Sequence, residues 1–189
     1  MKKYTPELLR LHRQALGAVC VALVLGGCAS ASIQSAKDPS FSDPIHKLFI
    51  ILNHGYVDKI NSSYTPFLIA ALKDEFSHEG VDVAIKAVDS LTSDEKGYPS
   101  EINSYEPDGI MTVVAVGGVE GAGGAATIIY DVSIFDAAQD KKRIWRAQIY
   151  SSGGALVKEK RMKILAQDLV KRLSEDKMIS SEPRKGRRV

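Results

Sequence analysis

The sequence predicts an α+β domain, a two-layer sandwich with the order β-α-β-β-β-β-α and two helices on one face of a mixed five-stranded sheet. Segments 81–87, 126–135 and 143–150 alternate apolar and polar residues, as strands with one buried face do. Segments 65–80 and 159–176 instead place apolar residues at helical spacing. Helices that gather on one face of a sheet bury both apolar surfaces in a single core.

A strand–helix–strand unit opens the predicted domain. Residues 47–52 form a short, continuous apolar run, which is typical of a strand buried on both faces. The helix that follows begins at Thr65-Pro66, an N-cap with proline in the first helical position, and ends at Gly80. Strand 81–87 completes the unit, and a crossover between parallel strands is right-handed.

Three further strands are expected to form an antiparallel meander. They cover 110–116, 126–135 and 143–150, and the first is apolar almost throughout, which favours a central position in the sheet. A long polar connection, 89–108, precedes them, and its residues 100–105 are compatible with a short helical turn. The second helix then closes the domain.

Residues 1–27 are typical of an export signal. A basic start precedes an apolar run from Ala15 to Leu25, which is too short to span a hydrocarbon core that needs about 20 residues. Leu25-Gly26-Gly27-Cys28 then resembles the lipobox of bacterial lipoproteins. The resemblance implies that the Cys28 thiol takes a diacylglycerol, that the chain is cut before it, and that the new amine is acylated. Several acyl chains together anchor a protein stably. The alternatives are an ordinary secretory signal or a buried helix with an incidental cysteine.

The rest of the chain divides by composition. Residues 28–44, rich in Ser, Ala, Asp and Pro, are expected to be the lipidated cysteine and a flexible tether. Residues 45–178 are expected to form a single α/β domain, and 179–189 a disordered basic tail. Ala29 in place of Asp after the anchor resembles the outer-membrane sorting pattern of enterobacterial lipoproteins.

The charge of the chain gives no reason to expect nucleic-acid binding. The signal carries four of the 25 Lys and Arg residues and one of the 23 Asp and Glu residues, which leaves 21 basic against 22 acidic residues in the rest. Of the two cysteines, Cys20 leaves with the signal and Cys28 takes the anchor, so we expect no intramolecular disulfide.

A glycine-rich segment joins two strands of the predicted meander. Gly118, Gly121, Gly123 and Gly124 superficially suggest a phosphate-binding loop, but such loops lead into a helix, and here a strand follows. A flexible hairpin connection is the simpler interpretation. The alternative is a mobile loop that contacts a partner through Gly121 and Gly123.

His54, directly after the first strand, is a candidate contact residue. The carboxyl ends of strands often carry sites, and a histidine there could act as a general base. No nucleophile signature accompanies it, so a polar loop or a ligand contact is favoured over catalysis. His78, Glu79 and Asp82 bracket the end of a helix without the spacing of a metal site, so we expect neither a metal nor another cofactor.

Trp145, the only tryptophan, is expected to be a core anchor or, alternatively, an interface residue. Asp131 and Asp136 are interpreted as surface charges. Basic residues gather at Lys141, Lys142, Arg143 and Arg146, and again in the tail. Solvation explains both groups, although either could contact anionic envelope polymers or lipid headgroups.

The meander motif resembles small α/β lipoproteins of the bacterial envelope. The residues that carry this resemblance are Ile128 to Ala137 and Lys142 to Ala147, a strand ending in Phe-Asp-Ala followed by a strand with Lys-x-x-Trp. Better-known members serve lipopolysaccharide, polysaccharide or peptidoglycan assembly as accessory factors. The resemblance implies an architecture and a location in the envelope. The lipobox, the tether, the lack of a catalytic set and a meander edge that could pair with a partner chain lead us to expect a non-enzymatic lipoprotein, anchored in the outer membrane through Cys28 and facing the periplasm, that binds an envelope protein partner. The alternatives are a periplasmic ligand-binding protein or hydrolase that uses His54, or a surface lipoprotein that contacts a host.

Overall fold

A computed structural model of the chain describes residues 29–53, 64–88, 98–120, 125–138, 142–154 and 158–180. The predicted export signal, Cys28 and tail residues 181–189 lie outside the described residues.

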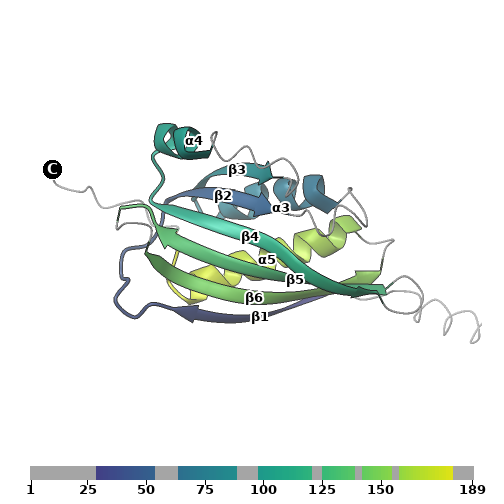
Figure 1. Cartoon of the computed structure of the whole chain (residues 1–189). Coiled ribbons are helices and arrows are strands. Elements are labelled where there is room, and N and C mark those ends of the chain that lie inside the picture. Colours follow the sequence, from purple (N-terminus) through teal and green to yellow (C-terminus); the bar gives the residue numbers. More distant parts are fainter. Residues whose placement is uncertain are drawn as a thin grey trace, which may run out of the picture.

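The α+β class and the mixed sheet are confirmed, with strands in the spatial order β1-β6-β5-β4-β2-β3 (Figure 1). The strands are β1 (Ser30–Lys37), β2 (Lys47–Asn53), β3 (Asp82–Val88), β4 (Gly109–Glu120), β5 (Ala125–Asp136) and β6 (Arg143–Gly154). The helices are α3 (Tyr64–His78), α4 (Tyr98–Tyr105) and α5 (Lys158–Glu175).

The prediction of five strands and of a tether over 28–44 is wrong, because Ser30–Lys37 forms a sixth strand. This strand, β1, pairs antiparallel with β6, and Ile33 lies opposite Ile149. Its inward residues include Ala31 and Ile33, which pack against the core. The alternation is hard to recognise because small residues carry most of it, and the partner strand lies more than 100 residues further along the chain. The folded domain therefore begins close to Ser30.

The predicted crossover and meander are confirmed. Strand β2 runs parallel to both β3 and β4, so that Ile50 lies between Ile85 and Met111. Its residues Leu48 and Phe49 are both buried, which shows that β2 is covered on both faces. Strands β4, β5 and β6 pair antiparallel in sequence order.

The core lies between the sheet and the helices α3 and α5, which also pack against each other. Each helix buries residues at intervals of three or four, as its apolar stripe predicted. These buried residues include Leu68, Leu72 and Phe76 of α3 and Met162, Leu165, Leu169 and Leu173 of α5. The facing side of the sheet contributes buried residues such as Tyr130, Val132 and Ile134.

A third helix, α4, makes the predicted helix count wrong, because the turn considered near 100–105 is a helix of eight residues. The Tyr105 ring meets Phe49 of β2 edge to face, with 5.9 Å between the ring centroids. Phe49 alternates along β2 with Leu48 and Ile50, which belong to the main core. Helix α4 therefore covers part of the opposite face of the sheet.

The C-terminal boundary of the domain lies beyond the predicted residue 178. Ile179 is buried and forms a parallel bridge with Ile45, and the backbone N–H of Ile45 donates to the carbonyl of Met178 at 2.8 Å. Ile179 is thus part of the core rather than the first residue of a tail.

Candidate functional site

Four of the five predicted site residues, Cys28, His54, Gly121 and Gly123, lie outside the described residues. The fifth, Trp145, lies in β6.

Trp145 is a core residue with 1% of its surface exposed. Its indole Nε1 donates to Asp176 Oδ2 at 2.8 Å, and the Ser35 hydroxyl donates to the same oxygen at 2.7 Å. Lys37 Nζ donates to the carbonyl of Asp176 at 3.0 Å. The expectation of a core anchor is therefore correct. The alternative role as a contact residue does not fit, because no ring surface remains for a partner.

The face of the sheet opposite α3 and α5, here called the open face, carries polar residues in rows across β1, β6 and β5. One row places Ala36, Arg146 and Ser133 side by side, and the next places Gln34, Gln148 and Asp131. These residues are exposed or half-buried, whereas Trp145, Ala147 and Ile149, which alternate with Arg146 and Gln148 along β6, are buried. The alternation of strand side chains thus separates the core from a polar surface.

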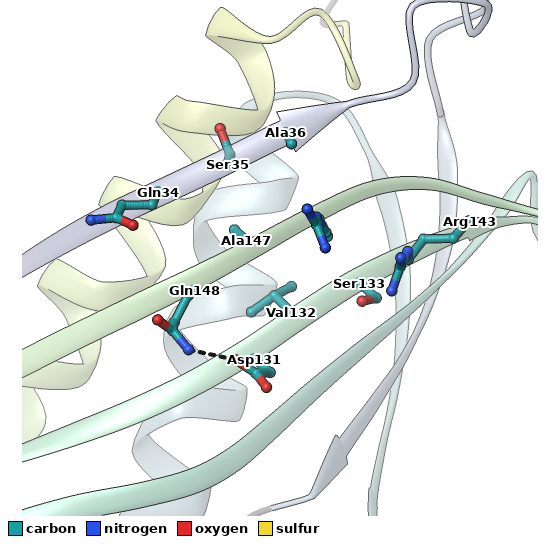
Figure 2. A pocket seen from close by; sticks show the side chains of 10 residues that line it. Gln34, Ser35, Ala36, Asp131, Val132, Ser133, Arg143, Ala147 and Gln148 are labelled. Atoms are coloured by element: carbon teal, nitrogen blue, oxygen red, sulfur yellow. Dashed lines mark hydrogen bonds between the residues drawn. The ribbon is translucent and has the colours of Figure 1, made fainter.

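A shallow hollow of about 470 Å³ lies on the open face (Figure 2). Gln148 Nε2 donates to Asp131 Oδ1 at 3.2 Å, and the Tyr150 hydroxyl donates to Gln148 Oε1 at 2.6 Å. Arg143 and Arg146 also line the hollow and are exposed. No carboxylate in the described part of the chain pairs with either guanidinium.

The chemistry of the hollow suits binding better than catalysis. Guanidinium groups offer several N–H donors in a planar fork that fits carboxylates and phosphates, and amides and a carboxylate can pair with hydroxyl groups. Among the residues that line the hollow, none is a histidine or a cysteine, and the hydroxyl of Ser35 already donates to the Asp176 carboxylate that also accepts the Trp145 indole N–H. The arrangement can therefore hold an anionic or hydroxyl-rich group.

One residue of the predicted basic cluster, Lys142, already forms an ion pair within the chain. Lys142 Nζ lies 2.7 Å from Asp38 Oδ2, and the side chain of Ser40 also donates to Asp38. The hydrogen bond from Lys142, with that from Ser40, holds the pKa of Asp38 well below its ordinary value of 3.8. Lys141 lies outside the described residues. Of the described members of this cluster, Arg143 and Arg146 are the two that line the hollow.

The interpretation of Asp136 as a surface charge is wrong, because only 8% of its surface is exposed. Its carboxylate accepts the backbone N–H of Ala138 at 2.8 Å. Nearby, Asp108 Oδ2 accepts the backbone N–H groups of His46 and Lys47, each at 3.1 Å. These carboxylates satisfy backbone donors at the ends of strands, which is a structural role.

Asp74, Glu75 and His78 place their ligand atoms within 4.8 Å of one another on α3. Residues one turn apart on a helix meet in this way without a bound ion, and His78 and Asp74 are exposed. This group shares only His78 with the set considered in the sequence, and it gives no independent reason to infer a metal.

A buried arginine, Arg161 of α5, escaped the sequence analysis. It is 1% exposed, its Nε donates to Ser151 Oγ at 3.1 Å, and its Nη2 donates to the Ser151 carbonyl. The guanidinium lies 5.6 Å from the centroid of the Tyr64 ring, and Nη1 has no partner among the described residues. The position continues the apolar stripe of α5 one turn before Leu165, which is the signal that could have revealed its burial.

None of the described helices is long and apolar enough to cross a membrane.

Comparisons with known proteins give only distant likenesses. No family model matches the chain, and a search of curated proteins finds no match. The PelC dodecamer from Paraburkholderia phytofirmans is similar with a TM-score of 0.48 at 11% identity, over 79% of this chain and 98% of that chain. A PDZ domain protein from Parabacteroides distasonis gives a TM-score of 0.40 at 8% identity, over 83% of this chain and 40% of that one. Both scores are too low to support a conclusion about fold or function.

Proposed function

We propose that this chain is a lipid-anchored envelope lipoprotein of the outer membrane, facing the periplasm, and that it is a non-enzymatic factor that binds a partner of cell-envelope assembly. The lipobox at Leu25-Gly26-Gly27-Cys28 carries this proposal. It follows an apolar run of signal-peptide length and ends two residues before β1 begins at Ser30, so that cleavage before Cys28 would leave the whole sheet intact.

The open face supports the partner-binding part of the proposal. Helices α3 and α5 occupy one face of the sheet. Helix α4 covers the other face only near β2 and β3, which leaves the part formed by β1, β6 and β5 to a partner. Arg143 and Arg146 supply cations that no carboxylate of the described residues pairs with, and Gln34, Asp131 and Gln148 supply further donors and acceptors. Arginine is enriched among the residues that contribute most to protein interfaces.

The edge of the sheet offers a second mode of contact. Strand β6, the last strand of the meander, does not form that edge, because β1 pairs with it. Strand β1 is itself a terminal strand of the sheet, and its residues other than Ile33 are small or polar. A partner strand could therefore add to β1 through backbone hydrogen bonds.

The test is a pull-down of the tagged, lipidated protein from gently solubilised envelopes. We expect a specific partner with the wild-type chain and loss of that partner with Arg143→Glu/Arg146→Glu. Lys163→Glu is the matched control, because Lys163 is an exposed cation on α5. Cys28→Ala shows whether capture needs the anchor. Equal capture by the arginine variant and the control would contradict the open face as the binding surface.

A ligand-binding protein or a hydrolase is the second candidate, and the hollow on the open face favours ligand binding. His54→Ala separates these options, since loss of an activity with retained folding would favour the hydrolase. Protease treatment of whole cells tests contact with a host, because complete protection would exclude exposure on the cell surface.

A further inference from the structure

One end of the sheet, here called the anchor end, is where β1 begins. A row of paired residues crosses the sheet there, from Ser30 through Ser152 and Thr127 to Val119. The row shows that the start of β1, the end of β6, the start of β5 and the end of β4 meet at this end, on the right of Figure 1.

The length of the chain limits how far Cys28 can lie from the anchor end. Only Ala29 stands between Cys28 and Ser30, and two extended residues span about 7 Å. Ala29 lies against β6 as well, because a Cβ on Gly153 would be 3.5 Å from Ala29 Cβ. Any acyl chains on Cys28 would therefore enter a membrane next to this end of the sheet, without a spacer.

Exposed apolar side chains gather toward the same end. The large hydrophobic residues that are exposed in the described part of the chain are Phe67 at 37%, Val116 at 48% and Val119 at 68%. Val119 belongs to the row that begins at Ser30, and Val116 lies at the irregularity in β4 between Ala115 and Gly117. Neighbouring strands lie about 4.8 Å apart, so Val119 is about 14 Å across the sheet from Ser30.

Helices α3 and α5 both begin near the anchor end. Helix α5 follows β6, and Lys158 in its first turn lies 5.4 Å from the centroid of the Tyr64 ring at the start of α3. Phe67, one turn into α3, is therefore also near the anchor end. The exposed charges in the first turn of α5 are Glu159 and Lys160, and Lys158 is half-buried.

We propose that the anchor end lies directly on the phospholipid surface that holds Cys28, with Val116 and Val119 in contact with the lipids. This inference rests on the proposed function, because it requires the acyl anchor. Exposed apolar side chains beside a lipid anchor gain contact with the acyl boundary at little further cost in entropy, since the anchor already holds them at the surface. The rival explanation is that a second copy of this chain covers the valines.

The experiment uses the mature lipoprotein, produced from the full chain and reconstituted in phosphatidylethanolamine–phosphatidylglycerol vesicles. Acylation consumes Cys28, so Val119→Cys introduces the only free thiol, which is labelled with an environment-sensitive fluorophore. Ala36→Cys is the matched control, because Ala36 is an exposed residue on the open face near the other end of β1. Mass spectrometry of the N-terminal peptide first establishes that Cys28 is acylated.

We expect a lipid-borne quencher to reduce the emission of the fluorophore at position 119 at least as strongly as a water-soluble quencher does. The same lipid-borne quencher is expected to leave the emission at position 36 unchanged. Equal quenching from water at both positions, in protein with an acylated Cys28, would overturn this inference alone. Protection of position 119 from both quenchers would overturn it in favour of a second copy. An unmodified Cys28 would overturn the proposed anchor, and with it the inference.

Discussion

At the scale of single residues, one carboxylate holds three elements together. Asp176, just after α5, accepts hydrogen bonds from Trp145 of β6 and Ser35 of β1, and its carbonyl accepts one from Lys37. The indole N–H belongs to a buried side chain, and a buried donor without a partner costs more than the net gain of an ordinary hydrogen bond.

We therefore expect Asp176→Ala to lower the free energy of unfolding by about 2 kcal/mol. Urea denaturation of the chain from Ala29 onward measures this change. Glu175→Ala is the control, because Glu175 forms surface ion pairs with Lys171 and Arg172, and its loss is expected to cost less than about 0.5 kcal/mol. In a Trp145→Phe background, Asp176→Ala is expected to cost less, since the indole donor is already absent; an unchanged cost would refute the coupling.

The ion pair between Asp38 and Lys142 gives a prediction about pH. Because the pKa of Asp38 is lowered in the folded state, the ionised carboxylate stabilises the fold at pH values above the ordinary pKa of an aspartate. This contribution disappears as the pH falls through the lowered pKa of the folded state. We expect carboxyl NMR to show Asp38 titrating well below 3.8 in the wild-type chain and closer to 3.8 in Lys142→Met. Identical titration curves would show that Lys142 does not cause the shift.

At the scale of elements, β1 decides where the domain begins. A tether would tolerate polar substitutions throughout, whereas a strand tolerates them on one face only. Ile33 packs against the core and Gln34 is exposed, although they are neighbours in the chain.

We expect Ile33→Asp to destabilise the domain by about 2–3 kcal/mol, because it places a charge against the core. Gln34→Asp is the matched control and is expected to change the stability by less than about 0.5 kcal/mol. Chemical denaturation of both variants compares them. If both substitutions were silent, residues 30–37 would behave as the tether that their composition suggests.

At the scale of the whole molecule, the two proposed surfaces lie toward opposite ends of the sheet. Arg146 pairs with Ala36, six residues along β1 from Ser30, so the two rows are about 20 Å apart at the usual rise of a strand. A membrane at the anchor end would leave the arginines of the open face directed into the periplasm.

This arrangement predicts that the short connection between Cys28 and Ser30 is needed to hold the anchor end against the lipid. An insertion of about eight Gly and Ser residues between Ala29 and Ser30 would let the domain leave the surface while Cys28 stays acylated. We expect lipid quenching at position 119 to fall toward the value at position 36, as measured in the same vesicles. Unchanged quenching would mean that the valines hold the end to the lipid without help from the anchor.

The sequence by itself determined the features that local pattern encodes. The apolar run of β2, the alternation in β5 and the stripe of α5 each lie within one segment, and each predicted the burial that the structure shows. The lipobox is likewise a local motif, and it remains a prediction because Cys28 lies outside the described residues. Trp145 was expected in the core for the same reason, since its neighbours alternate around it.

Tertiary structure alone decided the features that depend on pairing across the chain. Strand β1 has too few large apolar residues to be recognised from its sequence. It forms a strand because β6, more than 100 residues further along the chain, supplies its backbone hydrogen-bond partners. Arg161 and Asp136 are buried, and part of their polar groups bond to Ser151 of β6 and to the backbone N–H of Ala138, contacts that no count of residue types can reveal. The hollow that holds Arg143 and Arg146 exists only where β1, β6 and β5 lie side by side, because register brings together side chains that the sequence keeps far apart.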